Sequence, residues 1–390
     1  MDKEAFKGST SGRLVRTNIA LTPYWAFLPH PLPPQIPPTW KLTRLLAEAE
    51  HQVGVLAGLA RNIPDPDILI EPFMRREAVL SSRIEGTHTA LPELLGYESG
   101  HLLPGYSKSN QALLENREVL NYVSALKSGL EWIRHKPVNL ELIKELHRIL
   151  LYGVRGDEFP LGEFREMQNF IGKTNDPDDA NFIPPPVEEL SAVLRQFERY
   201  IENGNSYPAL IRIALVHYQF ETIHPFLDGN GRVGRLLIVI LLAAWNLLPV
   251  SLLYPSDYLE KHREQYYENL LKVSRDGDWE NWLAFFLHMV LDQSLDTIKR
   301  SNAIIELKEN WEDLLRQKRV SAYYFRIVDH LFSRPYVSVS DIEKLLSVTN
   351  KAARSMVENL AGEGVLVLSE EKKYGRIYEA APLVKILQEH

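Results

Sequence analysis

The chain has 390 residues, of which 45% are hydrophobic and 24% charged, a composition that excludes a largely disordered protein. Its 44 basic and 51 acidic residues give a net charge of −7, which excludes a uniformly basic surface for nucleic acid. Cysteine is absent, so disulfides, a thiolate nucleophile and cysteine zinc sites are excluded as well.

Neither a targeting signal nor a membrane span is visible in the sequence. The first residues are polar and lack the apolar stretch of a secretory signal. The longest unbroken apolar run, residues 236–245, is shorter than the about 20 residues that cross a bilayer. We therefore expect a cytoplasmic protein with no membrane partner, built from about two or three domains.

The first predicted elements are a strap and two helices. The proline-rich residues 28–40 predict an extended strap on the main domain rather than a ligand for a proline-binding module. Apolar residues at helical spacing follow in residues 42–60 and again in residues 68–86. Asp67 is the candidate cap of the second helix, and Gly86 is a natural residue to end it.

Further amphipathic helices are predicted within residues 107–155 and 187–222. The intervening residues 159–186 are rich in Gly, Pro, Asn and Asp, which indicates a hairpin or an ordered loop. Another long helical zone is expected from residue 229 to about 318.

The C-terminal residues predict a small separate domain. A helix at 321–333 precedes a strand and helix at 337–348, for which Ser340 is the candidate cap. A second helix at 349–364 and a two-stranded wing at 365–380 follow, and this order predicts a winged-helix domain. Its candidate recognition helix mixes Lys and Arg with Glu, so DNA binding stays uncertain beside protein binding or a structural role.

The densest chemical signal is HPFLDGNGRVGR, residues 224–235. Residues 229–231 form a turn directly before an apolar helix, where backbone N–H groups can bind an anion. Arg232 and Arg235 are three residues apart, so both can lie on one face of the first helical turn and hold phosphates.

Two neighbouring residues add chemistry to this anion site. Asp228 offers an oxygen ligand for Mg²⁺, which usually reaches a site together with phosphates. His224 supplies a base whose ordinary pKa is near neutral. A base, a metal ligand, an anion cradle and two cationic groups together indicate the transfer of a group from a nucleotide.

This segment resembles the Fic motif, HPFx(D/E)GN(G/K)RxxR, at every defined position. Residues 68–87 resemble the N-terminal region of that family, and residues 162–186 resemble its flap. The resemblance implies a mainly α-helical Fic core with a small β-hairpin flap. We accordingly expect an N-terminal strap and inhibitory-helix region at 1–110, a Fic catalytic core at 111–300, and a linker helix with the winged-helix domain at 301–390.

The resemblance implies a protein adenylyltransferase, which moves AMP from ATP, with Mg²⁺, to a Ser, Thr or Tyr hydroxyl of a target protein or of itself. A homodimer is a further implication. Gly231 stands where the phosphate-transferring branch, Doc, carries lysine, and this favours nucleotidyl transfer. Transfer of UMP or choline phosphate, removal of AMP, and a DNA-binding regulator that senses nucleotide stay open as alternatives.

The roles implied for single residues begin with His224 as general base, Asp228 as Mg²⁺ ligand and Phe226 as an inward-packing residue. Tyr267, or with less support Tyr266, would stack on adenine. The nucleotide-binding residues implied by the resemblance are Gly229, Asn230, Gly231, Arg232, Val233, Gly234, Arg235 and Tyr267.

Two further sites follow from the same resemblance. Ser81 and Glu85 match the family's inhibitory pattern, (S/T)xxxE(G/N), and share a helix face. Glu85 would then pair with Arg235 and compete with the γ-phosphate for that guanidinium. Phe182 and Ile183 belong to the flap, which would hold an extended target segment by strand addition, with a plain connecting loop as the alternative.

Overall fold

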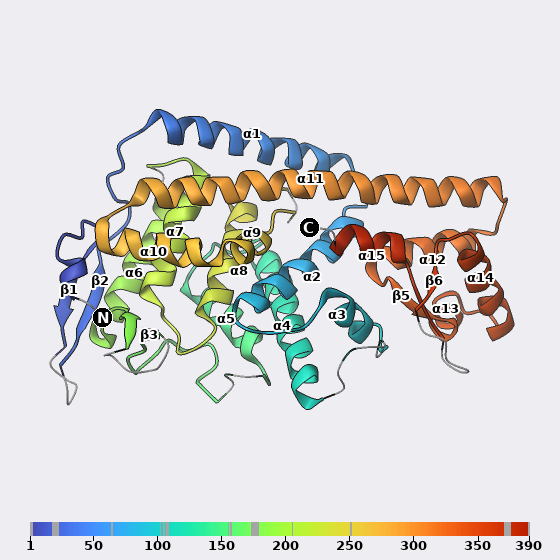
Figure 1. The fold of residues 1–390 in the computed structure, drawn as a ribbon, viewed down its shortest axis with the longest axis horizontal. Coiled ribbons are helices and arrows are strands. Elements are labelled where there is room, and N and C mark those ends of the chain that lie inside the picture. The colour runs from blue at the N-terminus through green and yellow to red at the C-terminus, as the bar shows by residue number, and fades with distance from the viewer. Residues whose placement is uncertain are drawn as a thin grey trace. The chain divides into compact units, whose positions relative to one another are not determined.

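Helices form most of the computed structural model, with three small antiparallel sheets among its described residues (Figure 1). The chain divides into two compact units, one of residues 1–58 and 121–294, the other of residues 59–120 and 295–390. The residues that the structure describes are 3–17, 23–63, 65–101, 103, 106, 109–154, 156, 158–172, 179–204, 206–249, 252–369 and 376–388.

The first unit opens with a short 3₁₀ helix, η1 (Lys3–Phe6), and the strands β1 (Gly12–Arg16) and β2 (Trp25–Pro29), which pair antiparallel. The proline-rich segment after β2 is bound to Tyr207 of the same unit. The hydroxyl of Tyr207 donates to Pro34 O at 2.9 Å and accepts from the N–H of Ile36 at 3.0 Å. The segment therefore lies along the first unit as an extended strap.

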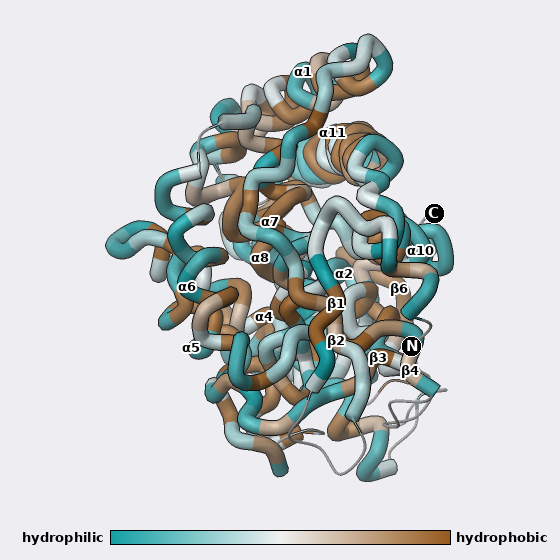
Figure 2. Tube along the Cα trace, turned by 90° about the vertical axis from the view of Figure 1, so that its left-hand side faces the viewer, coloured by the Kyte–Doolittle hydropathy of each residue, from teal (hydrophilic) through white to brown (hydrophobic). Residues whose placement is uncertain are grey.

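The helices of the first unit surround a buried pair, α7 and α8. Almost every side chain of these two helices is buried, and their hydrophobic residues are brown in Figure 2. A helix that is apolar all round is expected at the centre of a core. The bounds are α5 (Leu140–Leu151), α6 (Val187–Asn203), α7 (Ala209–Ile223), α8 (Asn230–Ala244), α9 (Ser256–Lys261) and α10 (Arg263–Asp276).

Three helices have residues in both units because of where the chain divides. They are α1 (Trp40–Asn62), α4 (Asn110–Trp132) and α11 (Trp279–Gln317), the long orange helix of Figure 1. The flap of the first unit is a hairpin of β3 (Ile171–Gly172) and β4 (Ala180–Phe182). The predicted helical core with a small hairpin is thus confirmed.

The second unit contains the C-terminal domain, whose topology confirms the predicted winged helix. The three strands pair in the order β5-β7-β6, with the two middle helices between β5 and β6 in the chain. The elements are α12 (Ala322–Ser333), β5 (Tyr336–Ser338), α13 (Val339–Leu346), α14 (Asn350–Gly362), β6 (Val367–Leu368), β7 (Ile377–Glu379) and α15 (Ala381–Gln388).

The cap of α13 differs from the prediction. Ser338, not Ser340, is the cap, because its side chain accepts from the N–H of Asp341 while Asp341 accepts from the N–H of Ser338. Ser340 also has an acidic residue three positions later, Glu343, so the sequence pattern fits both serines and only the structure assigns the capping box to Ser338.

The same unit contains α2 (Asp67–Ile84) and α3 (Leu91–Glu98). Asp67 is the first residue of α2 and not its cap, a position that Pro66 occupies without a side-chain hydrogen bond. Helices α12 and α15 of the C-terminal domain pack on α2. The second unit therefore joins α2 to the winged helix in one compact body.

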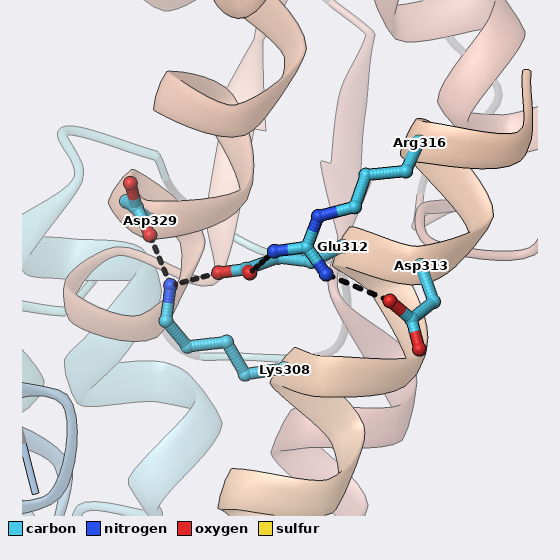
Figure 3. A network of polar contacts seen from close by, with 5 residues as sticks. All are labelled: Lys308, Glu312, Asp313, Arg316 and Asp329. Carbon is cyan, nitrogen blue, oxygen red and sulfur yellow. Dashed lines mark hydrogen bonds and ion pairs between the residues drawn. The ribbon is translucent and has the colours of Figure 1, made fainter. Parts of the chain in front are cut away.

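An ion-pair network connects the end of α11 with α12 (Figure 3). Lys308 pairs with Glu312 one turn later, at 2.7 Å, and with Asp329 of α12. Arg316 extends the network to Glu312 and Asp313, each at 2.7 Å. Because several charges share partners, the network holds α12 against α11 better than isolated surface pairs would. Among all described helices, none is long and apolar enough to cross a membrane.

Candidate active site

The predicted general base lies where α7 ends. His224 follows the last residue of α7 and adopts a left-handed backbone conformation, with φ 49° and ψ 62°. Its N–H donates to Phe220 O at 2.9 Å, and its ring Nδ1 lies 3.3 Å from Glu221 O. A carbonyl only accepts, so Nδ1 carries the proton there, and Nε2 is the nitrogen that can take up another.

The loop between α7 and α8 is closed by two side chains. Asn230 accepts from the N–H of Phe226 and donates to its carbonyl, both at 2.9 Å. The ring of Phe226 is fully buried and stacks on the imidazole of His147, with centroids 3.8 Å apart. Phe226 thus packs inward, as the resemblance implies, and Asn230 ties the loop to the start of α8.

Asp228 is the exposed carboxylate of this loop, with 39% of its side chain accessible. One oxygen accepts from the N–H of Gly229 at 2.7 Å, and the other lies 3.9 Å from Arg232 Nη2. Across the parts of the chain that the structure describes, no three His, Asp or Glu side chains gather as a metal site. One accessible carboxylate still suits Mg²⁺, which usually takes one or two carboxylates and the oxygens of phosphates.

Gly229 lies at the N-terminal cap of α8 with φ 76°, and the helix begins at Asn230. Gly231 is in the first turn, whose N–H groups have no acceptors within a helix and can bind an anion. The side chains of Arg232 and Arg235 are each 1% exposed. Buried guanidinium groups at a helix N-terminus concentrate positive charge, as a polyphosphate site requires.

Two other predicted nucleotide-binding residues face the protein interior. Val233 is fully buried in the core. Gly234 lies against α7, where a Cβ would come within 2.2 Å of Glu221 Oε1, so a larger residue there would require the side chain of Glu221 to shift.

The two adjacent tyrosines of α10 have different environments. Tyr266 is buried, and its hydroxyl donates to Nε2 of His217 at 2.8 Å. His217 in turn donates from Nδ1 to Gly234 O at 3.1 Å, and burial, with the nearby charge of Arg235, lowers its pKa to about 3. Tyr267 is 43% exposed and lies under the guanidinium of Arg263. Only Tyr267 of the pair presents a ring that a base could stack on.

The predicted target-binding side chains of the flap point into the first unit. Phe182 packs on Phe6 and Phe27, with ring centroids 6.2 and 5.6 Å apart. Ile183 is 1% exposed, and its carbonyl accepts from the N–H of Phe27 at 2.9 Å. Contact between the flap and a target would therefore use backbone groups rather than these two side chains.

Sequence reasoning did not single out three residues that contact the loop between α7 and α8: His147 of α5, Arg165 and Asn169. His147 stacks on Phe226 and lies 3.2 Å from Asp228 O through Nε2. Its spacing within an apolar helix face resembles an ordinary core position, so the sequence carried no signal for its role. Arg165 and Asn169 lie in the stretch identified as flap, and only the fold brings them to the loop.

The predicted inhibitory residues belong to the second unit. Ser81 is fully buried in α2, and Glu85 is its half-buried C-terminal cap, followed by Gly86 with φ 92° as expected. The next residues are fixed by α4, because Thr87 Oγ1 donates to Glu118 at 3.1 Å and the N–H of His88 donates to Glu115 at 2.9 Å.

Comparisons with family models, curated proteins and solved structures all identify the same family. Residues 43–131 match the family model "Fic/DOC family N-terminal", and residues 137–242 match "Fic/DOC family". The chain is 32% identical over 174 residues to the Drosophila grimshawi protein named "Protein adenylyltransferase Fic", covering 44% of this chain and 32% of that protein. It thus spans about a third of the length of this curated relative.

Solved structures show the same fold at low sequence identity. A Fic family protein from Desulfovibrio desulfuricans matches with a TM-score of 0.58 and 20% identity over 89% of this chain and 98% of the other. Fic-1 from C. elegans matches with a TM-score of 0.51 and 21% identity over 68% of this chain and 74% of the other. Since the two family models together match half of its residues, the chain belongs to the Fic/DOC family.

Proposed function

We propose that this chain transfers AMP from ATP to a hydroxyl side chain of a protein, including its own, with release of pyrophosphate. The observation that carries the proposal is the loop between α7 and α8. It places His224 at one end and the buried Arg232 and Arg235 at the other, around the exposed Asp228. The name of the fly relative supports the choice of AMP as the transferred group.

In this reaction Nε2 of His224 takes the proton from a target hydroxyl, and the oxygen attacks the α-phosphorus. The new bond joins that oxygen to phosphorus, and the bond from the α-phosphorus to the bridging oxygen breaks. Pyrophosphate leaves with the electron pair. Arg232, Arg235 and the N-terminal amides of α8 stabilise the negative charge on the phosphates, and fixed positive groups of this kind supply much of enzymatic catalysis.

Asp228 is the residue that would hold Mg²⁺ beside the phosphates. Its second oxygen is 3.9 Å from Arg232 Nη2, which leaves the carboxylate oriented but not neutralised by a close ion pair. The ion would neutralise phosphate charge when bound. Tyr267 would stack on the adenine, since its ring is the accessible one of the two.

We further propose that Glu85, supported by Ser81, restrains the transfer by competing for Arg235 with the γ-phosphate. A carboxylate and a phosphate oxygen both suit the same guanidinium fork. Glu85 caps α2 in a turn that α4 fixes on its C-terminal side, so its side chain starts from a defined backbone position.

The test compares wild type, Glu85→Gly and Glu85→Gly/His224→Ala with ATP labelled at the α-phosphate and Mg²⁺. Label on the protein is measured on a denaturing gel, and the adduct is identified by mass. We expect strong labelling only in Glu85→Gly. Absence of label in every variant, with other nucleotides also inactive, would overturn the proposed transfer.

A matched control is available within the same unit. Glu363 caps α14 with φ −91° and is followed by Gly364 with φ 76°, which is the geometry of Glu85 and Gly86. Glu363→Gly therefore makes the same chemical change at the end of another helix. If Glu363→Gly activates labelling as strongly as Glu85→Gly, inhibition is not specific to Glu85.

The mass of the adduct also separates the alternatives. If the adduct is UMP, the donor is UTP rather than ATP. If a labelled target instead loses AMP, the chain catalyses the reverse reaction. A DNA-binding role for the winged helix is tested by an electrophoretic shift with the full chain. Lys351→Ala/Arg354→Ala should abolish such a shift, because these exposed residues are the basic ones of α14.

A further inference from the structure

The backbone conformation of His224 has to be imposed by its surroundings. Its φ of 49° lies in the left-handed region, which residues with a side chain adopt rarely. Such a conformation persists where neighbouring groups fix it, and it is frequent at functional sites. Groups that bind the carbonyls of this loop can fix it in this way.

Two side chains from residues 165–169 bind those carbonyls, and we call Arg165 and Asn169 the carbonyl clamp. Nε of Arg165 donates to His224 O at 3.0 Å, and its backbone N–H donates to Pro225 O at 2.8 Å. Nδ2 of Asn169 donates to His224 O at 3.2 Å and to Phe226 O at 2.9 Å. The carbonyls of three successive loop residues are thus bound from one short segment.

Arg165 also binds the flap. Its Nη2 donates to Pro185 O at 2.6 Å, just after strand β4. Gln168 adds a bond from Nε2 to Pro184 O at 3.1 Å. The same guanidinium therefore contacts the backbone of the general base on one side and the end of the flap on the other.

The charge of Arg165 is unusual for its environment. The residue is 3% exposed, and its side-chain hydrogen bonds all end on carbonyl oxygens rather than on a carboxylate. Burial lowers its pKa to about 10, so the group stays charged at neutral pH. Burying a cation without an ion pair costs free energy of folding. The planar guanidinium offsets this cost with several fixed hydrogen bonds, a geometry that the single ammonium group of lysine could not supply.

We infer that the carbonyl clamp is a positioning device that couples the flap to His224, so that seating a target segment on the flap and orienting the base depend on one guanidinium. Arg165 is a positioning residue, since it acts through the loop and the flap rather than on the nucleotide. The activity part of this inference rests on the proposed AMP transfer, whereas the coupling of the two segments does not.

Arg165→Lys is the decisive variant, because it keeps the charge and removes the fork. In the Glu85→Gly background we expect kcat for self-labelling to fall by about tenfold or more, as for other small displacements of a catalytic group. Affinity for ATP, measured by calorimetry, should stay unchanged, because residues 229–235 are not bound by the clamp. Asn169→Asp, which replaces the amide donor by an acceptor facing the same carbonyls, should reduce kcat in the same way.

Arg212→Lys is the matched control in the same unit. Arg212 also donates to a carbonyl, that of Ile201, and stacks on Trp245, but it does not contact the loop or the flap. It should label as its parent does. Thermal unfolding of each variant identifies any that fails to fold, in which case Asn169→Asp decides the test.

Amide hydrogen exchange provides a readout that does not depend on activity. In Arg165→Lys, peptides covering 180–186 and 220–228 should both exchange faster, while the rest of the first unit is unchanged; Arg212→Lys should change neither peptide. Unchanged exchange in both peptides, or faster exchange throughout the unit, overturns the coupling. If the Glu85→Gly parent itself shows no self-labelling, the proposed AMP transfer is overturned instead. If Arg165→Lys lowers ATP affinity and kcat equally, the carbonyl clamp serves the nucleotide site.

Discussion

The imidazole of His147 lies flat on the ring of Phe226, with 6° between the two planes. Its Nδ1 accepts from the N–H of Gly162 at 2.9 Å, so the proton sits on Nε2, which points at Asp228 O 3.2 Å away. Burial lowers the pKa of His147 to about 4. Helix α5 thus supports the loop between α7 and α8 with a histidine that is neutral at physiological pH.

This arrangement predicts a loss of stability in mild acid. Below the ordinary pKa of 6.5 the unfolded chain binds a proton at His147 that the native state does not bind until about pH 4. At about 1.4 kcal/mol per pKa unit, the free energy of unfolding should fall by about 2 kcal/mol from pH 7.5 to 5 through this residue alone.

Denaturant unfolding at the two pH values measures this loss. His147→Gln can keep both hydrogen bonds without titrating, so its loss between pH 7.5 and 5 should be about 2 kcal/mol smaller than that of wild type. His288→Gln, at an exposed position of α11, serves as the control and should follow wild type. An unchanged pH dependence in His147→Gln would contradict the neutral buried histidine.

Because Gly156 lies close to Asp228, we expect the Mg²⁺ concentration needed for labelling to depend on this glycine. Gly156 has φ 94°, and a Cβ there would lie 2.7 Å from Asp228 Oδ2. Gly156→Ala should therefore displace the carboxylate that would hold Mg²⁺. In the Glu85→Gly background, we expect half-maximal labelling to need about tenfold more Mg²⁺, the effect of losing about 1.4 kcal/mol of binding.

Gly364→Ala separates this effect from backbone strain. Gly364 has a similar φ of 76°, but a Cβ there would meet no atom within 4 Å. The Gly364→Ala variant should lose some stability and keep the Mg²⁺ dependence of its Glu85→Gly parent. If Gly156→Ala also keeps that dependence, the position of Asp228 does not depend on the glycine.

The sequence was informative where chemistry is local. The loop of residues 224–235 and the end of α2 just before Gly86 follow from contiguous residues, and the structure has both. The same holds for the order of elements in the winged helix, although two nearby serines each have an acidic residue three positions later, so the sequence did not decide which of them is the cap.

Long-range contacts were beyond such reasoning. Arg165 and His224 are 59 residues apart and meet only because the segment before the flap folds back on the end of α7. The burial of Phe182 likewise depends on Phe6 of η1 and Phe27 of β2, which no local pattern connects to the flap. An arginine fork that binds carbonyls leaves no spacing in the sequence from which it could be recognised.

Helix α2 is tied to the C-terminal domain through Asp296 of α11. Asp296 lies 3.7 Å from Arg76 of α2 and 2.7 Å from Arg300, whose guanidinium donates to Ile386 O near the end of α15. If α2 carries the inhibitory Glu85, its position depends on this shared carboxylate. Asp296→Ala should remove the carboxylate that Arg76 and Arg300 share and thereby loosen α2.

We therefore expect Asp296→Ala to raise self-labelling of the wild-type chain by several-fold and to add little to Glu85→Gly, because inhibition can be removed only once. Lys318→Gln, which breaks a pair with Glu363 in the same unit, should leave labelling unchanged in both backgrounds. Equal increases by Asp296→Ala in both backgrounds would mean that it acts independently of Glu85. Non-additivity would instead connect α15 to α2 through one carboxylate, since Asp296 contacts both Arg76 of α2 and Arg300 of α11, which donates to Ile386 O of α15.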